Sequence, residues 1–177
     1  MRNNKYISYI VQSAVTAALY AVVTIMQNVL LPGSASMAVQ FRVSEAVTVL
    51  ALFSPSAISG LTIGCLIANI SSISSIGAVD VIFGSLASFL AALTMYKLRN
   101  VKFFKIPLIA LLMPAIMNGI IVGFEIDFFF VNQYRFDLTD FLINAGLVAI
   151  GEIAVLFALG LPLFIAIQKR NLSKKLS

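Results

Sequence analysis

Two charged residues stand at the head of an apolar run in the segment QFRVSEAVTVL, residues 40–50. Arg42 and Glu45 are three positions apart, a spacing that places them on one face of a helix. Away from water, an ionisable side chain is costly unless it is paired or faces a wet cavity. The pair therefore indicates either a binding site or an ion pair at a helix start, where Ser44 would act as the cap.

Carboxylates and asparagines occur together in two later apolar runs. Asn118 and Glu125 are seven residues apart and Asn144 and Glu152 are eight apart, so each pair lies on one helix face. Glu152 also follows Asp140 by twelve residues, or about 18 Å of helix, which places it deep within its run. A carboxylate at that depth, with no basic residue expected beside it, indicates a bound proton or a cationic ligand.

The elements that must position these side chains are membrane-spanning helices. The 177 residues are 60% hydrophobic and 11% charged, and the mean hydropathy of +1.02 lies outside the range of soluble domains. The apolar runs cover residues 7–31, 44–53, 56–71, 79–97, 106–126 and 140–168. Because a spanning helix needs about 20 residues, the second and third runs are short, and residues 43–71 could instead form one kinked span.

The basic residues decide between these topologies. Ten of the twelve Lys and Arg residues fall into three groups: Arg2 and Lys5; Lys97, Arg99, Lys102 and Lys105; and Lys169, Arg170, Lys174 and Lys175. The positive-inside rule assigns all three groups to the cytoplasm, so an even number of crossings must separate the first group from the second. We therefore predict an all-α integral membrane protein, a bundle of six transmembrane helices with a turn at residues 54–56 and with both N and C termini cytoplasmic.

In this topology the polar candidates gather in the outer half of the bundle. Asn69 ends the third run and Asp80 begins the fourth, near the same outer level. The predicted substrate-binding residues are Arg42, Glu45, Asn69, Asp80, Asn118, Glu125, Asn144 and Glu152. The asparagines are equally consistent with hydrogen bonds that only hold helices together. The remaining acidic residues, Asp127, Asp137 and Asp140, are expected in solvated outer loops.

Several function classes are disfavoured by what the sequence lacks. It has no His and a single Cys, Cys65, which we assign to packing, so neither a disulfide framework nor a Cys/His metal site is expected. The motifs of P-loop ATPases, zinc proteases and serine hydrolases are missing, so we expect no enzyme and no catalytic residue. We also expect no cofactor and no nucleic-acid partner. The two halves show no convincing internal repeat, which disfavours a self-sufficient carrier.

Small residues form stripes along three of the runs. They are Ala14, Ala17, Ala18 and Ala21 in the first run, Gly84, Ser88 and Ala92 in the fourth, and Gly119 and Gly123 in the fifth. Small side chains let helix backbones approach closely in membranes. Most such stripes pack within one chain, but one of them could face another membrane subunit.

Four segments of the chain are distinctive: QFRVSEAVTVLALFSPSAISGLTIGCLIANI, GAVDVIFGSLASFLAAL, NGIIVGFE and IGEIAVLFALGLPL. They contain the motifs Q-F-R-x-S-E-A, I-G-C-x-I-A-N and D-x-x-F-G-S-L-A, which are not common to membrane helices in general. These segments resemble the QueT family of membrane proteins, proposed transporters of queuosine precursors. The resemblance covers most of the chain, from the first predicted helix to the sixth.

The resemblance implies a substrate-binding S component of an energy-coupling factor (ECF) transporter, a type of ABC importer. Residues 1–177 would form one domain of six helices that holds a small vitamin-like ligand near the extracellular surface of a bacterial cell membrane. Its partners would be a transmembrane scaffold subunit and two ATP-binding subunits, which supply the ATPase that this chain lacks. Such proteins carry an Ala-x-x-x-Ala motif on the first helix that contacts the scaffold, and Ala14 and Ala18 match it.

The implied ligand is a deazaguanine such as 7-aminomethyl-7-deazaguanine, which carries an ammonium group and a guanine edge rich in N–H donors. Carboxylates suit both features, by charge and by bidentate hydrogen bonding. We expect Glu125 and Glu152 to contact this ligand, with support from Asn118 and Asn144. Further expected roles are a stacking lid, Phe41 or Tyr134, and a mouth shaped by Arg42 and Glu45.

The expected mechanism has two steps. Outer loops near residues 32–43, 72–79 and 127–139 close over the ligand, and the bundle then turns within the membrane to release it inward. Three alternatives remain open from the sequence. The ligand could be hydroxymethylpyrimidine or pyridoxine, whose S components share the fold. The chain could also be a stand-alone proton-coupled carrier with Glu152 as the proton site, or a structural subunit with no ligand.

Overall fold

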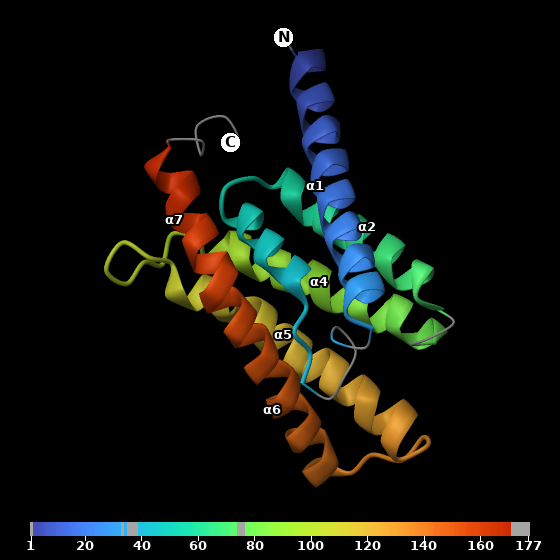
Figure 1. Ribbon diagram of the computed structural model, residues 1–177. Coiled ribbons are helices and arrows are strands. Elements are labelled where there is room, and N and C mark those ends of the chain that lie inside the picture. The colour runs from blue at the N-terminus through green and yellow to red at the C-terminus, as the bar shows by residue number, and fades with distance from the viewer. Residues whose placement is uncertain (1, 33, 35–38, 74–76, 171–177) are drawn as a thin grey trace.

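The computed structural model describes residues 2–32, 34, 39–73 and 77–170, and this part of the chain is almost entirely helical (Figure 1). The α-helices are α1 (Arg2–Leu30), α2 (Ser56–Ser71), α4 (Ala78–Leu98), α5 (Leu108–Glu125), α6 (Leu138–Val155) and α7 (Leu161–Lys169). A 3₁₀ helix, η1 (Val43–Leu52), precedes α2, and two π-helical segments, η2 (Ile126–Val131) and η3 (Leu156–Gly160), extend α5 and link α6 to α7. No strand occurs within the described ranges, so the predicted all-α class is confirmed.

Among the described residues, four continuous helices are long and apolar enough to cross a membrane. They cover Asn4–Leu30, Ala78–Leu98, Leu108–Val131 and Leu138–Lys169, and they support the prediction of a helical membrane protein. η1 and α2 are shorter. At about 2.0 Å per residue for a 3₁₀ helix and about 1.5 Å for an α-helix, they extend about 20 and about 24 Å in a hydrocarbon core about 30 Å thick. The count of six crossings depends on these two helices and stays a prediction.

The predicted turn at residues 54–56 is present between η1 and α2. Ser54 N donates to Leu50 O at 3.1 Å, and Ala57 N donates to Ser54 O at 3.2 Å. These bonds close the chain reversal at the one place where Pro55 interrupts the apolar sequence. Residues 43–71 therefore form two separate helices and not one kinked span.

η1 is the central element of the bundle. It contacts every α-helix, and eight of its ten residues are buried. The main apolar core surrounds its second half, where Val49 clusters with Leu61, Met95, Leu111 and Phe164. The first half of η1 lies farther from the turn at residues 54–56, in a part of the bundle where the buried side chains are mostly polar.

Two helix pairs pack closely through small residues, as the stripes that include Ala17 and Gly123 predict. A Cβ added at Gly64 of α2 would lie 2.7 Å from the backbone oxygen of Ala17 on α1. A Cβ added at Gly123 of α5 would lie 2.7 Å from Cα of Ala145 on α6. No side chain larger than hydrogen fits at these two crossings without moving a backbone.

The alanine stripe of α1 divides between two faces of the helix. Ala17 and Ala21 are buried, whereas Ala14 and Ala18 are exposed on the outside of the bundle. Val15, which lies between the exposed alanines in sequence, is 62% exposed. The two positions predicted to dock a scaffold subunit are therefore on the surface.

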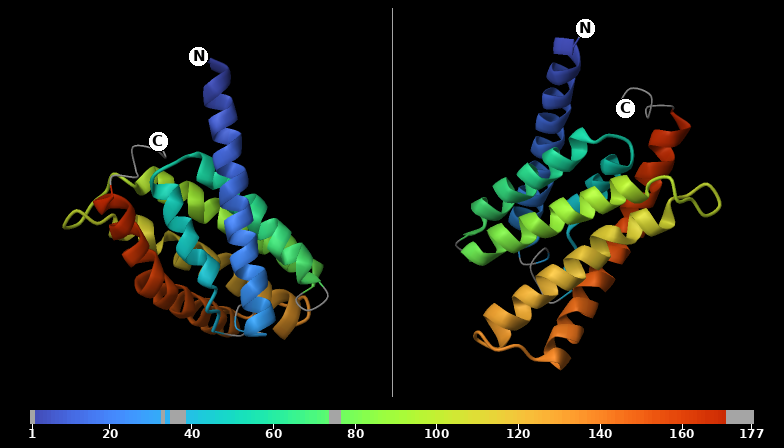
Figure 2. Two further views of the ribbon diagram at one scale, coloured as in Figure 1. Left: turned by 45° about the horizontal axis from the view of Figure 1, so that its top comes forward. Right: turned by 180° about the vertical axis from the view of Figure 1, so that it is seen from behind.

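The three basic groups of the sequence map to elements that lie toward one end of the molecule. The start of α1, the loop between α4 and α5, and the end of α7 all lie away from the loop between η2 and α6, which is at the opposite end (Figures 1 and 2). The first turns of α1 project beyond the other helices (Figure 2). We call this end the basic end and the opposite end the outer end. The prediction that the basic end faces the cytoplasm is not tested by the fold.

Candidate functional site

Seven of the eight predicted site residues are buried in the outer half of the bundle. Each is 3% exposed or less: Arg42, Glu45, Asn69, Asp80, Asn118, Glu125 and Glu152. They come from η1 and the residue before it and from α2, α4, α5 and α6. The eighth residue, Asn144, is half-buried on α6, and its side chain forms no hydrogen bond with another described residue.

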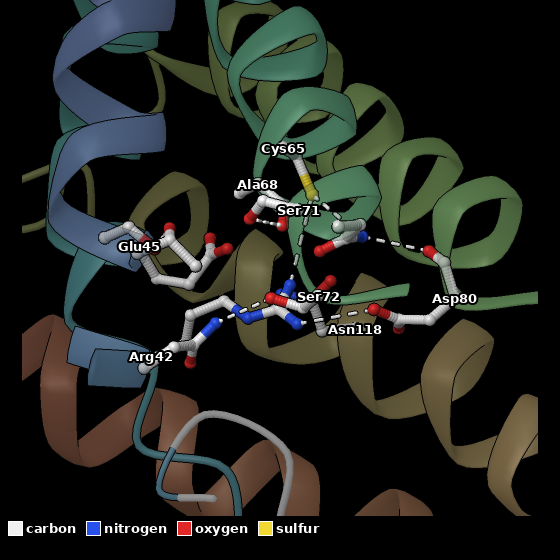
Figure 3. A network of polar contacts seen from close by, with 12 residues as sticks. Arg42, Glu45, Cys65, Ala68, Ser71, Ser72, Asp80 and Asn118 are labelled. Carbon is white, nitrogen blue, oxygen red and sulfur yellow. Dashed lines mark hydrogen bonds and ion pairs between the residues drawn. The ribbon is translucent and has the colours of Figure 1, made fainter. Parts of the chain in front are cut away.

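One group of contacts joins Arg42 to α2 and α4 (Figure 3). Arg42 Nη2 lies 3.9 Å from Asp80 Oδ2, forming an ion pair, and Arg42 Nη1 lies 4.0 Å from Cys65 Sγ. Asn69 Nδ2 donates a hydrogen bond to the backbone oxygen of Asp80 at 2.9 Å. Because 3.9 Å is longer than a charge-assisted hydrogen bond, Arg42 and Asp80 both keep capacity for a further polar partner.

Gly84 makes this arrangement possible. A Cβ added at Gly84 would lie 2.6 Å from Asn69 Nδ2 and 3.2 Å from Asp80 Oδ1. A methyl group at this position would therefore push the Asn69 amide away from Asp80. The motifs I-G-C-x-I-A-N and D-x-x-F-G-S-L-A meet here, since the first supplies Cys65 and Asn69 and the second supplies Asp80 and Gly84.

A second group of contacts joins Glu45 to α1. The hydroxyl of Tyr20 donates to Glu45 Oε1, and Thr24 Oγ1 donates to Ser44 Oγ at 2.7 Å. All four side chains are buried. The first turns of η1 are therefore fastened to α1 by polar side chains on one face of that helix.

The structure does not show the ion pair between Arg42 and Glu45 that was one interpretation of their spacing. Within the described residues Arg42 pairs with Asp80, and no side-chain cap is present at the start of η1, where Ser44 was the expected cap. Arg42 and Glu45 lie inside the bundle and not at its surface, and their role in shaping the mouth of the site stays a prediction.

A third group of contacts joins α5 to α6. Asn118 Nδ2 donates to Glu152 Oε1 at 3.0 Å. Glu125 is the last residue of α5, immediately before the π-helical segment η2, and η3 begins four residues after Glu152. π-Helical turns widen a helix locally and often occur at functional sites. Both carboxylates thus lie close to an irregularity in their helix.

Eight buried polar atoms in this region have no hydrogen-bond partner among the described residues. They are Nε of Arg42, Oε2 of Glu45, Oδ2 of Asp80, Oγ of Ser85 and Ser88, Oδ1 of Asn118, and Oε2 of Glu125 and Glu152. Buried polar groups in folded proteins are nearly always satisfied, so such a concentration is typical of a binding site. Five of the eight atoms are carboxylate or amide oxygens, which only accept hydrogen bonds.

The charge balance of the region points to the same kind of ligand. Four buried carboxylic residues, Glu45, Asp80, Glu125 and Glu152, face one buried guanidinium, that of Arg42. Carboxylates removed from water require protons, cations or hydrogen-bond donors. The arrangement therefore suits a ligand that carries N–H donors, positive charge or both.

Asp127 was expected in a solvated loop, and this prediction is wrong. Its side chain is 0% exposed. Asn132 Nδ2 donates to Asp127 Oδ1 at 2.6 Å and to Asp140 Oδ2 at 3.1 Å, and the backbone N–H of Asp137 donates to Asp127 Oδ2 at 3.3 Å. The loop after η2 therefore folds back and supplies donors that replace water. Asp137 also accepts from Thr139 N at 2.8 Å, capping the start of α6.

The two aromatic residues predicted as a lid are both at the outer end. Phe41 is 47% exposed and Tyr134 is 72% exposed. The Tyr134 ring packs edge-on against Phe128 and Phe129, with centroids 5.9 and 5.6 Å away. Tyr134 thus belongs to an aromatic cluster of η2 and its loop, and a stacking role toward a ligand stays a prediction.

Several polar residues near the site were not singled out from the sequence. Tyr20, Thr24 and Gln27 are spaced four and three residues apart on α1, and Gln27 Oε1 accepts from Val43 N at 2.8 Å. That helical spacing of polar side chains was the signal that could have revealed them. Cys65, assigned to packing, is indeed buried but also lies beside the Arg42 guanidinium.

An all-helical bundle with long apolar helices and a buried, acceptor-rich polar site has the architecture of a membrane transporter. The chain belongs to the QueT transporter family, whose sequence model matches residues 10–169. It is 32% identical over 162 residues to the queuosine precursor transporter QueT of Lactococcus lactis subsp. cremoris (strain MG1363). That alignment covers 84% of this chain and 85% of the relative. No solved structure matches the chain.

The family assignment confirms the resemblance of the sequence motifs. It places the chain among membrane transport proteins.

Proposed function

We propose that this protein is the substrate-binding S component of an ECF-type ABC importer and that it captures a queuosine precursor of the deazaguanine class. The observation that carries the proposal is the set of five buried acceptor oxygens that have no hydrogen-bond partner among the described residues, set against one guanidinium. The Lactococcus lactis relative is described as a queuosine precursor transporter, which supports the class of ligand.

The ligand chemistry complements these groups. The guanine edge of a deazaguanine presents two adjacent N–H donors, which one carboxylate accepts in a bidentate manner, and an aminomethyl group adds an ammonium for a second carboxylate. We assign these contacts to Glu125 and Glu152, with Asn118 holding Glu152 in place. The unpartnered Nε–H of Arg42 is then a donor for the purine-type carbonyl oxygen.

The partners proposed for this chain are a transmembrane scaffold subunit and two ATP-binding subunits, because the chain has no P-loop of its own. Ala14 and Ala18 would dock the scaffold from the exposed face of α1. A cavity of about 190 Å³ opens beside this face, between α1, η1 and α2, and Val11 and Val15 contribute to its lining. This cavity is at the basic end, apart from the polar site, so docking and ligand binding would use different surfaces.

The proposed transport cycle starts in the outer half of the bundle. The site residues are enclosed in this structure, so the predicted outer loops near residues 32–43, 72–79 and 127–139 would have to move to admit a ligand. Residues 33, 35–38 and 74–76 of these loops lie outside the described part of the chain. With six crossings, the basic end lies in the cytoplasm of a bacterial cell, and the loaded bundle turns on the scaffold to release the ligand inward.

Replacing Glu152 by Gln tests the site. Glu152→Gln keeps the shape of the side chain and its contact with Asn118 but removes the charge that the ligand would meet. A charge-assisted contact contributes about 1.5–3 kcal/mol, so the dissociation constant for 7-aminomethyl-7-deazaguanine should rise by about tenfold or more. The measurement is calorimetric titration of the purified protein in detergent.

Ser13→Ala is the control, since Ser13 is also buried but donates a hydrogen bond to the backbone oxygen of Ser56 near the basic end, away from the site. This variant should bind as the unchanged protein does. Wild-type affinity in Glu152→Gln would remove Glu152 from the site.

Two further measurements separate the alternatives. Mass spectrometry of the small molecule retained on purification distinguishes a deazaguanine from hydroxymethylpyrimidine, pyridoxine or no ligand. Uptake into liposomes that contain this chain alone, without ATP-binding subunits, would instead support a stand-alone proton-coupled carrier.

A further inference from the structure

A tight hairpin joins α4 to α5 at the basic end of the molecule. Phe103 N donates to Ile106 O at 2.8 Å, and Ile106 N donates to Phe103 O at 3.0 Å. The two residues between them, Phe104 and Lys105, have φ angles of 48° and 69°. Positive φ at both central residues is the geometry of two-residue hairpin turns, where Asn and Gly are usual and a bulky side chain is rare.

The apolar side chains of this hairpin make little contact with the rest of the chain. Phe104 is 91% exposed, Phe103 is 68% exposed and Val101 is 48% exposed. The two rings pack edge to face against each other, with centroids 5.8 Å apart. Exposing this much aromatic surface to water is unfavourable, so the hairpin needs an apolar environment that the bundle does not supply.

The charges around these rings are all positive. Four basic residues lie within nine positions: Lys97, Arg99, Lys102 and Lys105. The sequence has no acidic residue between Asp80 and Glu125, and the one ion pair found in the described ranges lies elsewhere. The Arg99 guanidinium instead stacks 3.6 Å over the ring of Tyr96. The hairpin is therefore suited to bind a surface that offers an apolar layer bordered by negative charge.

The hairpin starts where two long helices end. α4 ends at Leu98 and α5 begins at Leu108, and both belong to helices long and apolar enough to cross a membrane. Residues 99–106 therefore lie at the level where hydrocarbon meets lipid headgroups. Aromatic rings and basic side chains are typical of this layer, and anionic lipids attract clusters of Lys and Arg.

We propose that the hairpin at residues 99–106 anchors the bundle in the lipid surface at its basic end. Phe103 and Phe104 insert between headgroups, and Lys102 and Lys105 bind anionic phosphates. A lipid surface fits better than a protein partner, because lipid already borders the ends of both helices and the positive charge is spread over several long side chains. This anchor is independent of the identity of the transported ligand.

The chain contains its own control for this proposal. In the outer loop after η2, Gln133 and Tyr134 also have positive φ, at 46° and 70°, and the Tyr134 ring is 72% exposed. The charged residues around that loop are three acidic residues, Asp127, Asp137 and Asp140, and one basic residue, Arg135. The two loops thus share a backbone geometry and an exposed aromatic ring but differ in the sign of the net charge nearby.

Tryptophan fluorescence tests the anchor directly, because the chain has no Trp. Phe104→Trp and the matched control Tyr134→Trp are each reconstituted in vesicles of phosphatidylcholine, with or without phosphatidylglycerol. The emission maximum is measured together with quenching by aqueous acrylamide and by lipid brominated near the headgroup. Circular dichroism verifies that each variant keeps its helical content.

Adding phosphatidylglycerol should shift the Phe104→Trp emission to the blue and lower its acrylamide quenching by about twofold or more. Adding Lys102→Gln and Lys105→Gln should remove this response, and Tyr134→Trp should not respond to phosphatidylglycerol. Equal quenching of Phe104→Trp in both lipids, or a response that survives loss of the lysines, would overturn the proposal. Shielding that appears only after another protein subunit is added would assign the hairpin to protein docking and also overturn it.

Discussion

Arg42 and Asp80 should be strongly coupled in stability, because both are buried and they form the one ion pair found within the described residues. Removing one charge, in Arg42→Gln or Asp80→Asn, leaves the other buried without its partner. Breaking a buried ion pair from one side costs about 3–5 kcal/mol of unfolding free energy. Removing both charges together should therefore cost much less than the sum of the two single changes.

The size of the coupling follows from the distance between the charges. At 3.9 Å, two unit charges attract by about 4 kcal/mol when the effective dielectric constant is about 20. Glu45 is also buried near Arg42 (Figure 3), so Asp80→Asn leaves the guanidinium with some compensation. We therefore expect a coupling of about 2–3 kcal/mol, with Arg42→Gln the more damaging single change.

A double-mutant cycle measures this coupling. Each variant is unfolded by sodium dodecyl sulfate in mixed micelles, and the loss of helix is followed by circular dichroism. The matched control is a second cycle that combines Asp80→Asn with Lys102→Gln on the exposed hairpin, a pair that should be additive within about 0.5 kcal/mol. Additive effects of Arg42→Gln and Asp80→Asn would refute the pairing, and the ion pair would then not be what holds Arg42 against α4.

Two further substitutions test the packing of the site and the proposed docking face. Gly84→Ala should lower the unfolding free energy by about 1–3 kcal/mol and weaken ligand binding, because the new methyl group displaces Asn69 from Asp80; Gly146→Ala, which meets no atom within 4 Å, is the control in the same unfolding and titration assays. Replacing Ala14 and Ala18 by Leu should leave ligand binding intact but abolish co-purification with the scaffold subunit, and a complex that still forms would show that these alanines do not dock.

The apolar runs and the turn between η1 and α2 could be predicted from the sequence because they follow from local chemistry. Pro55 between two Ser residues interrupts an apolar run, and the basic groups restrict the number of crossings. The burial of Glu125 and Glu152 was also predictable, since each stands in a long apolar helix with an Asn at helical spacing.

The pairing inside the site could not be predicted in the same way. Arg42 has an acidic residue three positions away, yet it pairs with Asp80, because the 3₁₀ winding of η1 directs Glu45 toward Tyr20 on α1. Neither the 3₁₀ winding nor the packing of α2 against α4 has a local signature, since both depend on which helices surround η1. The burial of Asp127 was missed for a similar reason: its donors come from a loop that folds back over it.

The winding of η1 also sets a length within the molecule. Its ten residues rise about 20 Å as a 3₁₀ helix and would rise only about 15 Å as an α-helix. Rewinding this one segment would therefore draw the Ser54 reversal and the Arg42 guanidinium about 5 Å closer together. Because η1 contacts every α-helix of the bundle, a change in its helical pitch would shift the packing of all the helices around it.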